Sequence, residues 1–97
     1  MGEDLIRVRV LVGGRVQGVA YRFYAEKCAG RLGVAGWARN LADGRVEILA
    51  EGAAGDVEIF LDRLRAGPSL ARVDSFEVRR EAATGEFPDF RVVYFSG

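Results

Sequence analysis

Apolar and polar residues alternate regularly near the start of the chain. In residues 5–12 every even-numbered position is Ile or Val, and two odd-numbered positions are arginine. A period of two with β-branched residues predicts a strand with one buried face. Residues 34–40 and 45–50 predict two further strands, and Asp43-Gly44 between them is a tight-turn sequence. These two strands and their turn predict a β-hairpin.

Two other segments have apolar residues at helical spacing: Tyr21, Tyr24, Ala25, Cys28 and Leu32 in the first, and Val57, Phe60, Leu61 and Leu64 in the second. This spacing predicts two amphipathic helices, each with one apolar face. Gly33 is a suitable C-cap for the first helix, and Gly67-Pro68 ends the second.

The last part of the chain contains two short strand patterns. Phe76 and Val78 indicate a fourth strand, and residues 90–94 indicate a last one after a polar loop at 82–89. The element order is therefore β-α-β-β-α-β with one short extra strand at the C-terminus. This order predicts an α+β, ferredoxin-like βαββαβ sandwich, in which an antiparallel sheet carries two helices on one face. We expect a single domain over residues 1–97.

Composition narrows the function further. Fourteen Lys and Arg balance fourteen Asp and Glu, which does not favour a generally basic nucleic-acid binder. No apolar stretch reaches the roughly 18 residues that span a bilayer, and the acidic first residues are unlike a signal peptide. The chain has no histidine and one cysteine, Cys28, which excludes Ser-His, Cys-His and histidine-metal sites as well as an internal disulfide. We expect no membrane association and a reducing, cytoplasmic location.

The segment with most chemical content lies between the first strand and the first helix. Residues 14–19 read Gly-Arg-Val-Gln-Gly-Val, and Arg22 falls in the first helical turn. A glycine-containing loop before a helix can turn several backbone N–H groups toward one point, where the helix dipole also favours an anion. Arg22 could grip a phosphate in the same place with paired hydrogen bonds. Glycine loops and solvated first-turn arginines are also common, and the segment matches neither a Walker A motif nor GxGxxG.

A second cluster surrounds Asn40. This residue ends the second strand, directly before the hairpin turn, where asparagine side chains often cap turns. Trp37, three residues earlier, has the ordinary interpretation of a packing residue. From position alone, turn capping is the simpler role for Asn40.

Taken together, the motifs resemble those of the acylphosphatases. They are Gly14-Arg15-Val16-Gln17-Gly18-Val19 with Arg22, Gly36-Trp37-Ala38-Arg39-Asn40, Asp43-Gly44-Arg45-Val46-Glu47, Leu64-Arg65-Ala66-Gly67-Pro68, Ala71-Arg72-Val73 and Phe87-Pro88-Asp89-Phe90. The likeness extends over nearly the whole chain. It implies the ferredoxin-like fold and the hydrolysis of acyl phosphates to carboxylate and phosphate, without a metal or organic cofactor.

The resemblance also assigns site residues by position. Arg22 matches the family's phosphate-binding arginine, and Asn40 matches the asparagine that holds the attacking water. The backbone N–H groups that would surround the phosphate are those of Arg15, Val16, Gln17, Gly18 and Val19. The pair Ala20-Tyr21 departs from the glycine- or aromatic-plus-phenylalanine pair often found before the arginine, which could alter the packing behind the loop.

The chemistry explains why so few residues suffice. An acyl phosphate leaves as a carboxylate whose conjugate acid has a pKa of about 4, so no general acid is needed. What remains is to neutralise the phosphoryl oxygens and to place a water in line with phosphorus. The side-chain carbonyl of Asn40 can accept a hydrogen bond from that water. We expect the water's proton to go to a phosphate oxygen of the substrate.

Other functions fit the sequence less well. Cys28 lies on an apolar helix stripe, unlike the thiolate of a cysteine phosphatase. The three acidic residues that a metal phosphatase could use form a solvated helix face: Asp56, Glu58 and Asp62. A sheet that binds single-stranded RNA needs exposed aromatic residues, but the outward positions here carry mixed charges: Arg7, Arg9, Glu47, Glu77 and Arg79.

The main alternative is a binding module that holds an acyl or carbamoyl phosphate for a partner, with little turnover. Under the leading hypothesis we expect a small-molecule acyl phosphate substrate, phosphate or sulfate as competing anions, no nucleic acid or membrane partner, and a monomer.

Overall fold

The computed structural model describes residues 4–94, which form five strands and two helices. Their bounds are β1 Leu5–Arg15, α1 Tyr21–Leu32, β2 Ala35–Asn40, β3 Val46–Ala53, α2 Ala54–Ala66, β4 Arg72–Glu81 and β5 Phe90–Val93. The predicted order of elements is confirmed, including the short extra strand. Strands β1 and β3 each run about three residues beyond the predicted ends, because they continue to pair with their neighbours through glycine-containing sequence.

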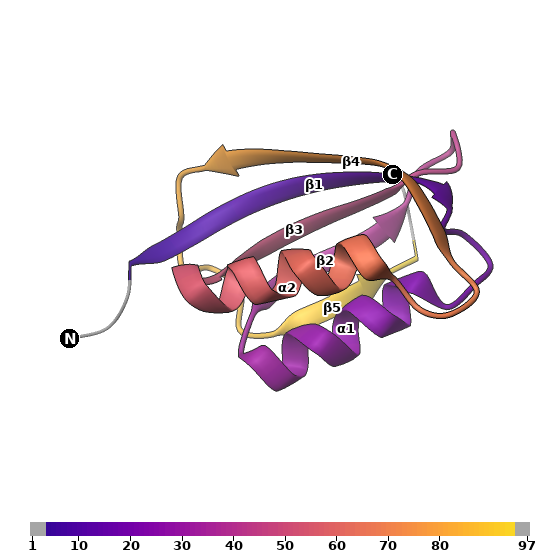
Figure 1. Cartoon of the computed structure of the whole chain (residues 1–97). Helices are drawn as coiled ribbons and strands as arrows, with labels where there is room; N and C mark the ends of the chain where they lie inside the picture. Colours follow the sequence, from indigo (N-terminus) through magenta and orange to yellow (C-terminus); the bar gives the residue numbers. More distant parts are fainter. Residues whose placement is uncertain (1–3, 95–97) are drawn as a thin grey trace.

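The strands form one sheet in the order β4-β1-β3-β2-β5, and both helices cover the same face of it (Figure 1). The two helices on one face agree with the predicted ferredoxin-like sandwich. The expected antiparallel sheet is wrong for one pairing, because β5 runs parallel to β2 while the other three pairings are antiparallel.

The direction of β5 follows from where the chain enters the sheet. Glu81 ends β4 opposite Arg7, close to the start of β1, and Ala35 starts β2 opposite Glu51 at the same end of the sheet. Residues 82–89, the crossing segment, carry the chain along this end from one edge of the sheet to the other. Strand β5 therefore starts beside the start of β2 and runs in the same direction.

The core lies between the sheet and the helices. Most of its strand residues are ones that the alternation predicted to face inward: Val8, Val10, Val12, Val46, Ile48 and Ala50. The helices contribute their apolar faces, with Phe60 and Leu64 fully buried and the half-buried Cys28 packed against the cluster. Each fully buried aliphatic or aromatic side chain contributes about 1.5–3 kcal/mol to folding.

One glycine is required by the close approach of β2 and β3. Gly36 has φ +137°, and a Cβ at this position would lie 1.8 Å from the carbonyl oxygen of Leu49. No other residue can occupy this position without separating the two strands. Any separation would also shift Asn40, which ends the same strand.

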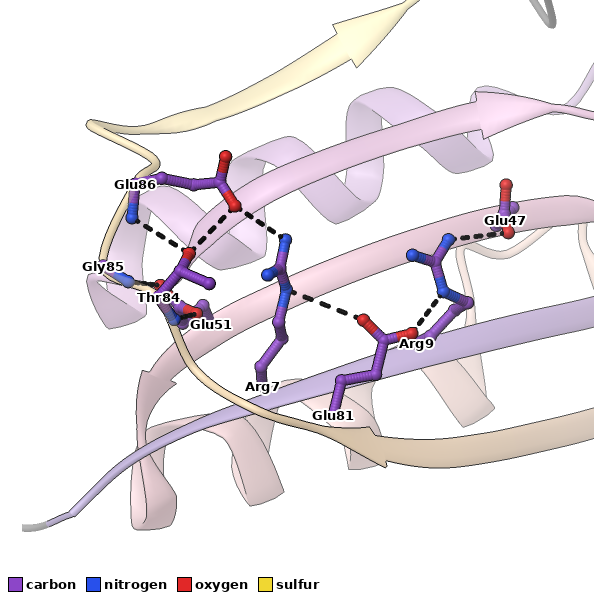
Figure 2. A network of polar contacts seen from close by, with 8 residues as sticks. All are labelled: Arg7, Arg9, Glu47, Glu51, Glu81, Thr84, Gly85 and Glu86. Atoms are coloured by element: carbon purple, nitrogen blue, oxygen red, sulfur yellow. Dashed lines mark hydrogen bonds and ion pairs between the residues drawn. The ribbon is translucent and has the colours of Figure 1, made fainter.

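The opposite face of the sheet carries the mixed charges expected from the sequence, and many of them are paired (Figure 2). Arg9 bridges two carboxylates, with Nε 2.6 Å from Glu81 and Nη1 3.0 Å from Glu47. Hydrogen bonding to Arg9 lowers the pKa of Glu81. The guanidinium groups of Arg9 and Arg39 lie 5.8 and 5.3 Å from the centre of the Trp37 ring, which agrees with its expected packing role.

Glu51 attaches the crossing segment to the sheet. Its side chain accepts hydrogen bonds from the backbone N–H groups of Thr84 and Gly85, at 2.8 and 2.7 Å (Figure 2). The residue is only 3% exposed, so water does not compete for these bonds. Beside it, Arg7 bonds Glu86 at 3.3 Å. The start of β5 is thus held by side chains of β1 and β3.

Neither helix of the described residues is long and apolar enough to cross a membrane.

We expect Glu51→Ala to lower the free energy of unfolding by about 2–4 kcal/mol, because two hydrogen bonds to a buried carboxylate are lost and two N–H groups are left without an acceptor. Denaturant unfolding measures this loss. Asp74→Ala is the matched control, since it removes a carboxylate from an exposed pair with Arg72 and should leave the unfolding midpoint nearly unchanged. Equal effects of the two substitutions would show that Glu51 does not hold the crossing segment.

Candidate active site

The loop that joins β1 to α1 begins at a bulge. The pairing of β1 with β4 shifts by one position between Gly13 and Gly14, and Gly14 has φ +122°. A Cβ on Gly14 would lie 2.2 Å from the carbonyl oxygen of Arg72, so this position also requires glycine. The bulge turns the end of β1 toward the N-terminus of α1.

The loop then adopts the left-handed backbone conformation at two positions. Among the described residues of this loop, Gly18 and Ala20 have positive φ, at 73° and 62°, and their neighbours do not. Alternation of right- and left-handed residues turns successive N–H groups toward one side and produces an anion-binding concavity. The left-handed conformation costs an alanine about 1–2 kcal/mol, so the surrounding structure must hold it in place.

Two apolar side chains hold the loop against the core. Val16 is 1% exposed and Val19 is 9% exposed, and both belong to the central hydrophobic cluster. Within residues 4–94, no backbone carbonyl accepts a hydrogen bond from the N–H groups of 16–19, and no side chain caps the first turn of α1. Side chains therefore fix the loop while its N–H groups and the positive end of the helix dipole remain available to an anion.

Arg22 is not the freely solvated residue that a first-turn arginine often is. Its Nη1 donates a 3.0 Å hydrogen bond to the carbonyl oxygen of Val93, and its guanidinium lies 5.1 Å from the centre of the Tyr94 ring. The guanidinium has several further N–H donors available for an anion. Contacts from β5 and the residue after it thus hold Arg22 at the end of the sheet.

Asn40 ends β2 with its side chain on the same face as that of Ala38, the face covered by the helices. Its Oδ1 atom is buried and has no hydrogen-bond partner within residues 4–94. Such an atom is costly unless a partner is supplied, and a water can supply it. Asp43 takes the turn-capping role considered for Asn40, because its Oδ1 accepts the N–H of Arg45 at 3.0 Å.

The fold brings these groups to one end of the sheet. Val93, which holds Arg22, pairs with Arg39, the residue before Asn40. The loop is linked to the same place, because Gln17 donates hydrogen bonds to backbone carbonyls of the β2–β3 hairpin. The loop, Arg22 and Asn40 therefore meet where β2 and β5 end.

N–H groups without an acceptor among residues 4–94, together with a guanidinium at the same end of the sheet, suit a tetrahedral anion. A buried amide oxygen at that end suits a polarised water. Within the described part of the chain, no three Asp, Glu, Cys or His side chains gather as a metal ligand set. The acidic residues considered as metal ligands lie on α2, where Glu58 and Asp62 are exposed.

Sequence reasoning missed two features of this site. The first is the support of Arg22 by the Val93 carbonyl and the Tyr94 ring, for which only the alternation at 90–94 gave a hint. The second is the side chain of Gln17, because only backbone N–H groups of this loop were expected to take part in the site.

Tyr21 lies directly behind the loop. It is 1% exposed, and its hydroxyl donates a 2.6 Å hydrogen bond to the carbonyl oxygen of Leu64, in the last turn of α2. Carbonyls in a last turn have no partner within their own helix, so the hydroxyl satisfies one of them. Burial raises the pKa of Tyr21, which keeps the hydroxyl protonated and able to donate. The departure at Ala20-Tyr21 thus adds a bond between α1 and α2.

Comparison with known proteins gives consistent results. The sequence profile of the family described as Acylphosphatase matches residues 8–92. A relative from Methylococcus capsulatus, named acylphosphatase, is 56% identical over 87 residues, which cover 90% of this chain and 95% of that protein. The crystal structure of acylphosphatase from Bacillus subtilis superposes with a TM-score of 0.88 at 35% identity, covering 92% of this chain and 99% of the other.

The fold also occurs within a much larger protein. Full-length HypF, in its phosphate- and nucleotide-bound form, contains a region that matches all of this chain with a TM-score of 0.83. The match covers 13% of that protein at 24% identity, which establishes a shared fold alone.

We expect Tyr21→Phe to lower the free energy of unfolding by about 1–3 kcal/mol, because the buried Leu64 carbonyl loses its donor and water cannot replace it. Thermal or denaturant unfolding measures the change. Tyr24→Phe is the matched control: the Tyr24 hydroxyl bonds the Arg63 carbonyl at 2.9 Å in an exposed position, where water can take its place. A Tyr21→Phe variant as stable as the Tyr24→Phe variant would contradict this role.

Proposed function

The chain belongs to the acylphosphatase family and hydrolyses acyl phosphates, and on this premise we propose that Arg22 binds the phosphoryl group while Asn40 holds the attacking water. The N–H groups of residues 15–19 surround the remaining phosphoryl oxygens. The bulge at Gly14 and the alternating φ signs support this role for the loop, since both direct N–H groups toward one point.

The observation that carries the proposal is the buried, unpartnered Oδ1 of Asn40 at the end of the sheet where Arg22 is held. An amide oxygen accepts a hydrogen bond and is a negligible base near neutral pH. Asn40 therefore orients a water without removing its proton. Fixing this water against a held phosphoryl group replaces an encounter from bulk solvent, which is a major part of the catalysis required.

The reaction then proceeds by in-line displacement. The water oxygen forms a bond to phosphorus as the bond between phosphorus and the acyl oxygen breaks, and the acyl group leaves as a carboxylate. The water's proton goes to a non-bridging phosphate oxygen, so the product is inorganic phosphate. Negative charge on the phosphoryl oxygens is balanced throughout by Arg22 and the loop N–H groups, which are in place before reaction.

We further propose that the enzyme uses no cofactor, that tetrahedral anions compete with its substrate, and that it acts as a monomer. The enzyme needs no metal, because Arg22 supplies the positive charge and a carboxylate leaves unprotonated. Phosphate and sulfate, which share the tetrahedral shape of the phosphoryl group, compete with the substrate. The 97 residues act as one domain, a monomer in the cytoplasm, in keeping with the balanced charge and lone cysteine.

We expect opposite kinetic signatures from the two site residues. Arg22→Ala should raise the inhibition constant of inorganic phosphate by about 10- to 100-fold, because a charge-assisted contact is lost. Asn40→Ala should change that constant little and lower kcat by about 100-fold, because it displaces the water and leaves the phosphate contacts in place. Steady-state hydrolysis of benzoyl phosphate, with phosphate as inhibitor, measures both.

Circular dichroism and unfolding of each variant provide the control for folding. An Asn40→Ala enzyme with near-normal kcat would exclude the water-holding role. An Arg22→Ala enzyme that binds phosphate as tightly as the parent chain would move the anion site elsewhere.

Hydrolysis should also survive a chelator. We expect excess EDTA to leave the rate of benzoyl phosphate hydrolysis unchanged, since every charge that the mechanism needs comes from the chain. The matched measurement adds Mg²⁺ or Zn²⁺ to the dialysed enzyme. Activity lost with EDTA and restored by either ion would contradict the mechanism.

A further inference from the structure

We propose that the side chain of Gln17 is a positioning residue that sets Asn40 relative to the phosphate-binding loop. The inference rests on the proposed role of Asn40 in holding water. It gives the Gln17 side chain a task distinct from that of the backbone N–H groups around it.

The contacts of Gln17 are specific. Its Nε2 donates to the carbonyl oxygen of Leu41 at 2.8 Å and to that of Arg45 at 2.9 Å. A carboxamide nitrogen has two hydrogens, and this one uses both. The amide nitrogen therefore has none left for a phosphate, which argues against a direct substrate contact from it.

The two acceptors are placed where they affect Asn40. Leu41 follows Asn40 directly, and its own N–H donates to the Arg45 carbonyl at 2.8 Å, closing the hairpin at this point. Gln17 thus binds the carbonyl groups of the two residues, Leu41 and Arg45, that close the β2–β3 hairpin. A shift of the Leu41 peptide rotates the end of β2, and the side chain of Asn40 moves with it.

At its other end, Gln17 belongs to the part of the loop that is anchored in the core by Val16. Its predecessor Val16 is buried in the core, and its successor Gly18 has a left-handed backbone conformation. One side chain therefore spans the gap between the groups that would hold phosphate and the strand that would hold water. In-line attack depends on this relative placement, because small displacements of reacting groups cost large factors in rate.

The chemistry of the contact restricts the residue at position 17. Both targets are carbonyl oxygens, so the side chain must donate. Methionine has nearly the same length and no donor, and glutamate would set a carboxylate against two carbonyls. Lysine keeps a donor with several hydrogens on a side chain long enough to reach them.

A double-mutant cycle tests the inference. We expect Gln17→Met to lower kcat for benzoyl phosphate by about 10-fold in the parent enzyme, with Gln17→Lys retaining most of the activity. In the Asn40→Ala background, Gln17→Met should change kcat by less than about twofold, because the water that it helps to place is no longer held. The inhibition constant of inorganic phosphate should change less than kcat does.

Asp43→Ala is the matched control. It removes a hydrogen bond to Arg45 from the same hairpin but makes no link to the loop, and we expect kcat to stay within about twofold of the parent value. A similar loss of kcat in Asp43→Ala and Gln17→Met would mean that any weakening of the hairpin is sufficient, which overturns the specific role of Gln17.

The outcomes separate this inference from the proposed function. A normal kcat in Asn40→Ala alone would refute the proposed function. A large loss in Asn40→Ala, combined with the same 10-fold effect of Gln17→Met in both backgrounds, would overturn the role of Gln17 and leave the proposed function intact. Unfolding measurements accompany each variant. If Gln17→Met and Gln17→Lys are both unfolded under assay conditions, Gln17 supports the whole fold, and this result would overturn the inference.

Discussion

The parallel pairing of β5 with β2 is the constraint on which the rest of the site depends. It is short, since β5 has four residues, yet it brings the Val93 carbonyl beside the end of β2 and gives Arg22 its hydrogen-bond acceptor. Without β5 at this edge, the guanidinium would extend into solvent from the first turn of α1. The crossing segment, held by Glu51 at the opposite end of the sheet, determines where β5 begins. Contacts at one end of the domain therefore support a charged group at the other.

The site itself is made largely of backbone. A bulge, a left-handed alanine and a helix N-terminus orient N–H groups, and two buried valines keep the loop from relaxing. Dipoles fixed in this way need little reorganisation when charge builds up on a bound phosphoryl group, which is the main source of electrostatic catalysis. Under the proposed mechanism the acyl-phosphate bond is already activated, so this small set of groups would be enough for its hydrolysis.

Sequence patterns predicted the elements, the core faces of β1 and β3 and the hairpin, because burial repeats every second residue in strands and every third or fourth in helices. They did not predict the direction of β5, since a period of two is the same in parallel and antiparallel strands. The support of Arg22 could not be foreseen either, because a main-chain carbonyl such as that of Val93 has no side-chain signature. Position alone favoured Asn40 as the turn cap, whereas in the structure Asp43 accepts the turn's hydrogen bond from the N–H of Arg45. The roles of Arg22, Asn40 and the loop came from family resemblance and stay predictions.

The lack of histidine has a consequence for how the protein responds to acidity. A guanidinium, a carboxamide and peptide N–H groups keep the same protonation state across the physiological range. Inorganic phosphate interconverts between monoanion and dianion within that range, so the proposed site would meet two forms of the same ligand while remaining unchanged itself. Any pH dependence of anion affinity at such a site would then come from protonation of the anion, because the charges of the site itself stay constant.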